Sequence, residues 1–378
     1  MHYWEFFSLL LLLLYVGLIG TFAYGWFSIP EFKSENSASD FIRFDVLVPL
    51  RNEEAQVRRL LQNFRRLDYP LNRFSITLIN DHSTDNTERE IRVCMAEFPE
   101  FPFRLINVAE IEGLGSKKAA ITYGIQQSDA DWIVLTDADC SHAVNWLKTL
   151  SAFVVSRNAK MVYAPVMFGS ENTFQHMQAL EFAGLLGIGA AAIQLKNPNM
   201  CSAANLSFSK TVFAEVGGYQ DKMHLASGDD EFLLHKVFKR YPNQVFFLKN
   251  RDALVVTDAN STLRQLSDQR RRWVSKSTHY DNRYITAILI GAYLFNLSIL
   301  VNLILGIWNP QFLSIGAAQL LGKALVEFSI LFPVVHFFKR SALIVFLIVA
   351  EPFHILYVLI IGIWANLGAY NWKGRQQK

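Results

Sequence analysis

The sequence predicts an α/β domain set between membrane-spanning helices, one before it and three after it. From residue 44 onward, short runs rich in β-forming residues alternate with amphipathic stretches, which predicts a parallel sheet with helices on both faces. Apolar stretches long enough to cross a bilayer lie at both ends of the chain. Polar residues follow three of the predicted strands directly, and this indicates a ligand site.

Composition narrows the functional class. The chain has 378 residues, of which 51% are hydrophobic and only 18% are charged. Its formal net charge is +3, and no long run of Lys and Arg lies along one face, so we expect no nucleic-acid partner. The three cysteines, Cys94, Cys140 and Cys201, have neither metal-type spacing nor a disulfide pattern, which favours a reducing compartment.

The first predicted element is a membrane anchor over residues 1–30. Its apolar run, 6–27, has the length of about 20 residues that a bilayer-crossing helix needs. A cleavable signal peptide is the alternative, but the run lacks a basic segment before it and a small-residue cleavage site after it. An uncleaved anchor is therefore favoured. A polar linker, 33–40, joins it to the next domain.

The predicted catalytic domain covers residues 41–260. Its expected strands are 44–50, 74–80, 103–108 and 132–136, and its expected helices are 53–67, one opening after the turn 81–85, and 117–127. Ligands of such sheets bind beyond the carboxyl ends of the strands. The polar residues at those ends are Arg51 and Asn52 after the first strand, Asp81 after the second, and Asp137 and Asp139 after the fourth.

Asp137-Ala138-Asp139 is the candidate metal site. Two carboxylates one residue apart at a strand end can share Mg²⁺ or Mn²⁺, and that ion neutralises a diphosphate leaving group. The alternative is a solvated acidic loop, because an isolated acidic pair of this kind is a weak signal.

Two turns have both a structural and a functional interpretation. Residues 81–85 form either an Asx-type turn that caps the next helix or a turn in which Asp81 accepts hydrogen bonds from a nucleoside. Gly115-Ser116-Lys117 is either a surface turn or the placement of a cation near phosphate.

Gly228-Asp229-Asp230-Glu231 carries three acids in a row. Adjacent carboxylates repel one another, which raises a carboxyl pKa and suits a base that takes a proton from an acceptor hydroxyl. An acidic helix N-terminus stabilised by the helix dipole is the alternative.

A membrane-proximal segment, 261–282, contains Gln269-Arg270-Arg271-Arg272-Trp273. Basic residues flanking a membrane helix on its cytosolic side, with an interfacial tryptophan, explain this run without any catalytic role. The predicted C-terminal membrane domain, 284–365, holds apolar runs at 284–308, 312–338 and 341–364, and a basic tail, 366–378, follows. The arginines favour a cytosolic catalytic domain, whereas simple alternation of helices would put the tail outside unless Glu351-Pro352 breaks the last helix.

Taken together, the ordered motifs resemble the membrane-bound family 2 glycosyltransferases, which include cellulose, chitin and hyaluronan synthases and ceramide glucosyltransferases. The resemblance runs from residue 44 to residue 273 and rests on these segments: Val48-Pro49-Leu50-Arg51-Asn52-Glu53-Glu54, Asn80-Asp81-His82-Ser83-Thr84-Asp85, the Gly-x-Lys turn at Lys117, Asp137-Ala138-Asp139, Asp229-Asp230 and Gln269-x-x-Arg272-Trp273. It implies a GT-A (Rossmann-like) α/β catalytic domain, an inverting mechanism and a nucleotide-sugar donor, commonly a uridine diphosphate sugar.

The resemblance also implies residue roles. Asp139 with Asp137 would hold the divalent metal, and Asp230, next to Asp229, would be the general base. Gln269, Arg272 and Trp273 would close over the diphosphate and acceptor. The implied donor-binding residues are Pro49, Arg51, Asn52, Glu53, Asp81, Ser83, Lys117 and Asp137.

The chain departs from the family pattern at four positions. The family often has Asp at position 80 and Gly at position 82, where this chain has Asn80 and His82. Asp229 replaces the usual Glu, and Ala203 replaces Gly in the loop that leads to Asn205.

The acceptor is predicted to be a membrane lipid. The apolar stretch 173–194 suits an interfacial helix, with a buried core helix as the alternative, and the ending Trp372-Lys373-Gly374-Arg375 resembles the tail of lipid-directed relatives. Lys323, Glu327 and Glu351 lie within membrane helices, where charges are costly, and would serve either a lipid head group or a growing glycan.

These features predict a multi-pass protein of a bacterial inner membrane. Its partners would be a nucleotide sugar, the bilayer and a lipid acceptor. The alternatives are processive synthesis and export of a polysaccharide, and a non-catalytic membrane scaffold or nucleotide-sugar sensor.

Overall fold

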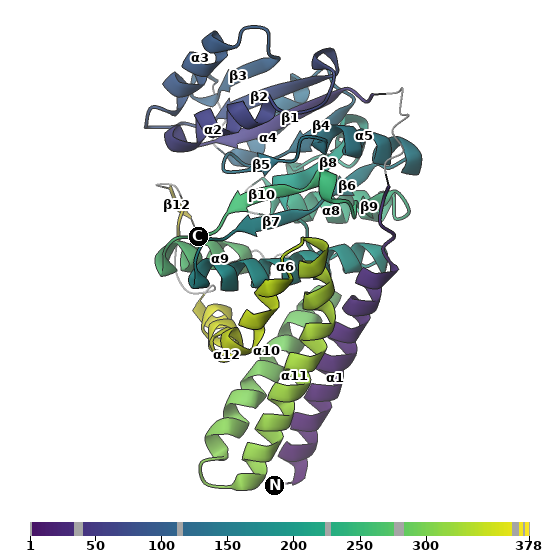
Figure 1. The fold of residues 1–378 in the computed structure, drawn as a ribbon, viewed down its shortest axis with the longest axis vertical. Helices are drawn as coiled ribbons and strands as arrows, with labels where there is room; N and C mark the ends of the chain where they lie inside the picture. The colour runs from purple at the N-terminus through teal and green to yellow at the C-terminus, as the bar shows by residue number, and fades with distance from the viewer. Residues whose placement is uncertain are drawn as a thin grey trace. The chain divides into compact units, whose positions relative to one another are not determined.

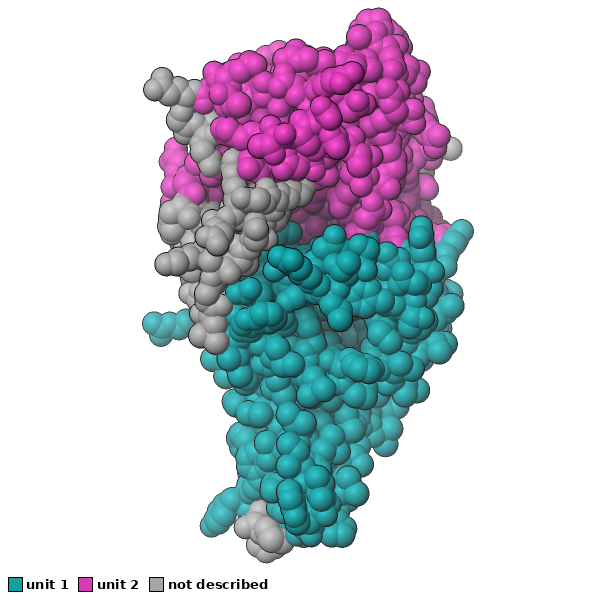
Figure 2. All heavy atoms as spheres, turned by 90° about the vertical axis from the view of Figure 1, so that its left-hand side faces the viewer, with its two compact units in different colours: residues 1–28, 170–191, 259–378 teal, residues 29–169, 192–258 magenta. Residues whose placement is uncertain are grey.

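The computed structural model describes residues 2–33, 41–111, 116–223, 228–275, 283–364, 370–372 and 375–377. Among the predicted features, the linker 34–40, Gly115 and most of the tail 366–378, including Lys373 and Gly374, lie outside the described residues. The chain divides into two compact units: unit 1 comprises residues 1–28, 170–191 and 259–378, and unit 2 comprises residues 29–169 and 192–258 (Figure 2).

Unit 2 contains a seven-stranded sheet in the order β3-β2-β1-β4-β8-β6-β9 (Figure 1). Its first four strands along the chain are β1 (Phe44–Leu50), β2 (Phe74–Asn80), β3 (Phe103–Asn107) and β4 (Trp132–Leu135). All four run parallel, as the alternating pattern predicts. The carboxyl ends of β1, β2 and β4 therefore meet at one edge of the sheet.

The rest of the sheet corrects the prediction of a wholly parallel architecture. β8 (Leu206–Ser209) runs antiparallel to both β4 and β6 (Met161–Tyr163), while β9 (Val245–Phe247) is parallel to β6. The sheet is thus mixed, because β8, an inner strand, runs opposite to both of its neighbours. A second sheet has the order β5-β10-β7, from Ser141–His142, Val255–Asp258 and Val166–Gly169.

Helices of unit 2 form where apolar residues recur at helical spacing. In α2 (Glu54–Phe64) the buried residues are Val57, Leu60, Leu61 and Phe64, which fall on one face. The other helices of eight or more residues within this unit's described residues are α3 (Thr87–Glu97), α4 (Lys117–Gln126), α5 (Trp146–Arg157) and α8 (Asp229–Arg240). β1 is almost fully buried, so the core centres on it.

Unit 1 is a helical bundle. α1 (His2–Ser28), α10 (Arg283–Leu305) and α11 (Pro310–Phe337) run side by side (Figure 1), and α12 (Phe346–Trp364) follows a short 3₁₀ turn, Ser341–Val345. In the described residues, five helices are long and apolar enough to cross a membrane, namely these four and α6 (Thr173–Gln194).

Helix α6 belongs mainly with the bundle of unit 1, although it falls within the predicted catalytic domain 41–260. It crosses the bundle helices rather than running along them (Figure 1). Two glycines allow close packing: a Cβ at Gly184 would lie 2.9 Å from Leu331, and one at Gly187 would lie 2.6 Å from Val334. The interfacial placement of this helix stays a prediction, because its length and composition also suit a membrane span.

Candidate active site

The loops after β1 and β2 are joined by hydrogen bonds between their side chains and backbones. The Asn52 backbone N–H donates to Ser83 Oγ (3.1 Å), and the Thr84 N–H donates to Asn52 Oδ1 (2.8 Å). Asn52 and His82 both have left-handed backbones, with φ of 54° and 56°. Such strain in non-glycine residues is typical of functional sites, and it explains why glycine would suit position 82.

Arg51 and Asp81 secure the same pair of loops. One Arg51 nitrogen, Nη1, donates to the backbone oxygens of Asp81 (2.9 Å) and His82 (3.1 Å). Asp81 is only 2% exposed, and its Oδ1 lies 2.9 Å from His82 Nδ1. The backbone N–H of Glu53 donates to Thr87 Oγ1 (2.7 Å). These contacts give the loop residues a structural role that is compatible with donor binding.

Lys117 joins two acidic segments that lie far apart in the sequence. Its Nζ lies 3.7 Å from Asp137 Oδ1, after β4, and 3.6 Å from Asp229 Oδ2, at the start of α8. Lys117 itself begins α4, where Ser116 caps the helix by accepting from the Ala119 N–H. The structure therefore brings Lys117, Asp137 and Asp229 into one cluster, which we call the acidic site.

Asp230 is held beside this cluster. Its Oδ2 accepts from the Ala203 N–H (3.1 Å) and its Oδ1 from the Glu231 N–H (2.9 Å). Burial raises the pKa of the Tyr219 hydroxyl well above its ordinary value, and the carboxylates of Asp229 and Asp230 raise it further. A protonated phenol therefore stands near the acidic pair at neutral pH.

Asp137 and Asp139 are the residues that the sequence predicts to hold a divalent ion. Both side chains are partly exposed at the end of β4, and burial together with these two carboxylates raises the pKa of the Cys140 thiol. Within the described ranges, no group of three or more His, Cys, Asp or Glu side chains is arranged to hold an ion. A pair of carboxylates still fits Mg²⁺ or Mn²⁺, which commonly takes one or two protein carboxylates and substrate phosphates.

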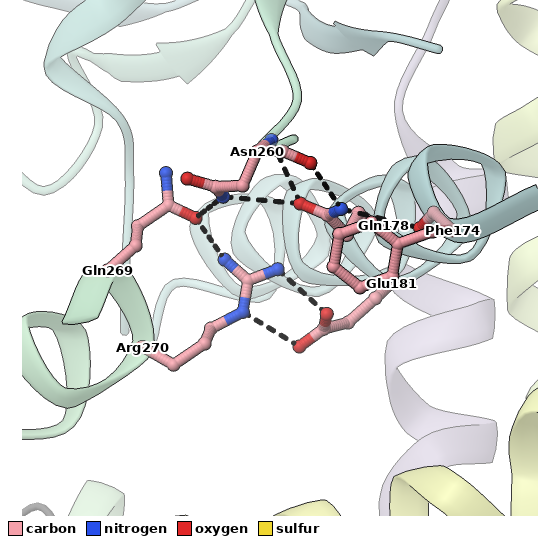
Figure 3. A network of polar contacts seen from close by, with 6 residues as sticks. All are labelled: Phe174, Gln178, Glu181, Asn260, Gln269 and Arg270. Carbon is pink, nitrogen blue, oxygen red and sulfur yellow. Dashed lines mark hydrogen bonds and ion pairs between the residues drawn. The ribbon is translucent and has the colours of Figure 1, made fainter. Parts of the chain in front are cut away.

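The Gln269-x-x-Arg272-Trp273 segment lies on α9 (Leu263–Ser275) of unit 1. Gln269 Oε1 accepts from Asn260 Nδ2 (2.9 Å) and from Arg270 Nη1 (2.6 Å), as Figure 3 shows. The Trp273 ring lies 4.2 Å from the Arg270 guanidinium, while Arg272 is partly exposed. Gln269, Arg272 and Trp273 thus lie on one helix of unit 1, whereas the residues of the acidic site belong to unit 2.

The sequence analysis did not predict that Arg270 is buried and paired with an acid of another helix. Arg270 is 1% exposed and forms two hydrogen bonds to Glu181 of α6, at 2.7 and 3.2 Å (Figure 3). A lone acid within an apolar helix was the available signal, because a buried carboxylate needs a partner.

Asn205, which ends the loop in which Ala203 replaces the family's glycine, is buried. It donates to the backbone oxygens of Pro165 and Ala253 (both 2.8 Å) and accepts from Trp146 Nε1 (2.9 Å). These three bonds use its amide for structure.

A family model described as glycosyl transferase family 2 matches residues 45–217, which include Asp81, Lys117 and the Asp137–Asp139 pair. The glycosyltransferase AglE of Haloferax volcanii is 25% identical over 194 residues, covering 49% of this chain and 58% of that protein. A beta-monoglucosyldiacylglycerol synthase of Nostoc sp. is 26% identical over 102 residues, covering 27% of this chain and 21% of that protein. The match therefore spans less than two thirds of either relative.

A solved structure shares the fold over nearly the whole chain. The mannosyltransferase PcManGT from Pyrobaculum calidifontis, in complex with GDP-Man and Mn²⁺, has a TM-score of 0.60 at 17% identity. The similarity covers 96% of this chain and 98% of that one. At this identity the likeness shows the fold, which is of the GT-A type.

Proposed function

We propose that this chain is a glycosyltransferase that glycosylates a membrane lipid, and the match of residues 45–217 to the family 2 glycosyl transferase model supports this. The donor would be a nucleotide diphosphate sugar, such as a UDP-sugar, used with inversion at the anomeric carbon. The catalytic domain would lie on the cytosolic side. Cys94, Cys140 and Cys201, which are buried thiols outside any disulfide, are compatible with that reducing compartment.

The observation that carries the proposed use of a nucleotide diphosphate sugar is the position of Lys117. A cation between Asp137 and Asp229 links the strand-end acids to the acidic start of α8. Phosphate oxygens are good partners for a lysine ammonium group, and a diphosphate carries more than one negative charge. We infer that Lys117 contacts the diphosphate when the donor binds.

Asp230 is the proposed base. Its carboxylate would accept the proton of the lipid hydroxyl as that oxygen attacks the anomeric carbon and the nucleoside diphosphate leaves. The backbone N–H groups of Ala203 and Glu231 fix its orientation before substrate arrives. Asp137 and Asp139 would hold Mg²⁺ or Mn²⁺, which supplies charge neutralisation of the leaving diphosphate. Asp81 and the Asn52–Ser83 loop pair would hold the nucleoside.

Three features support a lipid acceptor. A relative is named as a beta-monoglucosyldiacylglycerol synthase, and five described helices have the length and composition of membrane spans. One polar cluster inside the bundle is satisfied internally: Asn302 contacts Trp4, Ser8 and Gln319 at 2.8–3.1 Å. Groups paired in this way favour a closed bundle over the polysaccharide-conducting channel that a processive synthase requires.

The decisive experiment offers purified protein a panel of nucleotide sugars, total membrane lipid and Mn²⁺, and then weighs the products. One added hexose on a lipid supports the proposal, whereas a ladder of sizes supports a processive synthase. No transfer from any donor would indicate a scaffold.

The base assignment has its own test. Asp230→Asn should lower kcat by at least about a hundredfold while leaving nucleotide affinity unchanged. The matched control is Asp131→Asn, because Asp131 is an exposed acid just before β4, at the opposite end from Asp137. Normal turnover by Asp230→Asn would contradict the assignment.

A further inference from the structure

Helix α12 carries a polar stripe within an otherwise apolar sequence. Glu351, His354 and Tyr357 are spaced three residues apart, so they lie on neighbouring positions of one helix face. They belong to the candidate span Ser341–Trp364, whose mean hydropathy is 2.5. Ionisable groups in such a setting are costly and call for partners of their own.

One end of the stripe meets an ion cluster on α11. Lys323 is 0% exposed, and its Nζ lies 2.7 Å from both Glu327 Oε1 and Glu351 Oε2. Tyr15 of α1 donates to Glu327 Oε1 at 2.5 Å. Three helices, α1, α11 and α12, thus converge on these four side chains.

The middle of the stripe connects this cluster to α9. His354 Nδ1 lies 3.4 Å from Lys323 Nζ, and His354 is also within electrostatic reach of Glu181 and Arg270. Tyr357, the next residue of the stripe, is close enough to Glu181 and Arg270 to interact electrostatically with both. The polar contacts therefore continue from Lys323 to Arg270 through residues of unit 1 alone.

The other end of the stripe is the network in Figure 3. Arg270 pairs with Glu181 and with Gln269, and Asn260 joins Gln269 to Gln178 of α6. About two turns after Tyr357 on α12, the Trp364 ring lies 4.8 Å from the Arg271 guanidinium. Arg270 and Arg271 therefore link α9 to α6 and α12, and the Trp273 ring adds a contact with Phe182 of α6.

α9 depends on these contacts for its position, because few of its apolar side chains are buried. It has 13 residues, and Arg270 and Arg271 are its buried ones among those described. A helix of this length is marginal by itself in water. The contacts of the two guanidinium groups with α12 and α6 therefore contribute to its placement.

We propose that the α12 stripe, from Lys323 through Glu351, His354 and Tyr357 to Arg270, positions the Gln269-x-x-Arg272-Trp273 helix for sugar transfer. Lys323, Glu351 and Tyr357 are positioning residues that never touch the substrate. The inference rests on the proposed function, because it assumes that the motif residues of α9 act in the reaction. Stability alone does not require the cluster, since apolar replacements of a buried ion group are often neutral or stabilising.

The first test is Tyr357→Phe, which removes one hydroxyl and keeps the ring. We expect kcat to fall by about tenfold, with KM for the donor unchanged, because a small displacement of reacting groups is enough for such a loss. The control is Tyr24→Phe, because Tyr24 is 69% exposed on α1. Unchanged kcat in a folded Tyr357→Phe protein would overturn the proposal.

The second test neutralises the distant end with Lys323→Met, Glu327→Gln and Glu351→Gln combined. Hydrogen–deuterium exchange of peptides covering 263–275 should become faster in both this variant and Tyr357→Phe, while exchange over β1 and β2 stays unchanged. Hydrogen exchange does not depend on turnover, so it tests the positioning role of the stripe separately from the proposed glycosyltransferase activity. If wild type transfers no sugar, only the proposed activity is refuted. Wild-type exchange in α9 of both variants overturns the stripe's role, and if the triple variant does not fold, Tyr357→Phe decides.

Discussion

Replacing Arg270 by Leu should destabilise the protein more than any exposed arginine replacement on the same helix. Arg270 is 1% exposed, and its guanidinium makes two hydrogen bonds to Glu181, one to Gln269 and a cation–π contact with Trp273. Removing it leaves the Glu181 carboxylate in a largely buried position without its cation.

The expected magnitude follows from that orphaned charge. Removing one partner of a buried ion pair costs about 3–5 kcal/mol. The Glu181 side chain is 24% exposed, so water partly compensates and about 3 kcal/mol is the appropriate end of the range. Arg270→Leu combined with Glu181→Leu should cost clearly less than Arg270→Leu alone, because no unpaired charge remains.

The measurement is equilibrium unfolding in mixed micelles, followed by tryptophan fluorescence, for wild type, both single variants and the double variant. The control is Arg264→Leu, since Arg264 is exposed on the same helix. Strict additivity of the two single changes, or an effect of Arg270→Leu no larger than that of Arg264→Leu, would refute the reasoning.

Three further predictions concern unit 2. Burial lowers the pKa of His142 from 6.5 to about 3, so between these pH values the unfolded chain binds a proton that the folded protein does not. The free energy of unfolding should therefore be independent of this group above pH 6.5 and fall by up to about 4 kcal/mol as the pH drops toward 3. Urea titrations at several pH values measure this fall, and His142→Asn should reduce it. Lys117→Met should raise the Kd for the nucleotide sugar by about tenfold in calorimetry, and an unchanged Kd would remove Lys117 from the diphosphate site. Gly218→Ala should cost about 1–3 kcal/mol, because φ is +48° and the new Cβ would lie 2.6 Å from Phe213, whereas Gly20→Ala on α1 meets nothing within 4 Å and should not destabilise in the same thermal melt.

The strands and their C-terminal polar residues were predictable because local sequence determines both. β1 and β2 have the predicted bounds, since each is a short apolar run that ends at a polar turn. The loops that follow were also identified as functional candidates, and the left-handed φ of His82 agrees with a position where the family has glycine. Each of these features depends on residues within a few positions of one another.

Features set by distant contacts were not predictable. The antiparallel direction of β8 depends on its pairing with both β4 and β6, and Leu206–Ser209 has no sequence signal for direction. The pairing of Lys117 with Asp229 is equally non-local, because it joins the starts of α4 and α8. A sequence supplies the charged groups but not the distances between them.

Unexplained charges were nevertheless a usable signal for the membrane unit. Glu181 and Lys323 both interrupt strongly apolar helices, and each has a partner on another helix: Arg270 for the first, Glu351 for the second. The same reasoning applies to α9, but it starts from a buried cation and leads to its acidic partner. If Gln269, Arg272 and Trp273 face the substrate, the residues between them are available to hold the helix. A guanidinium keeps its charge when buried, so a carboxylate is its most favourable partner. For Arg270, that carboxylate is Glu181.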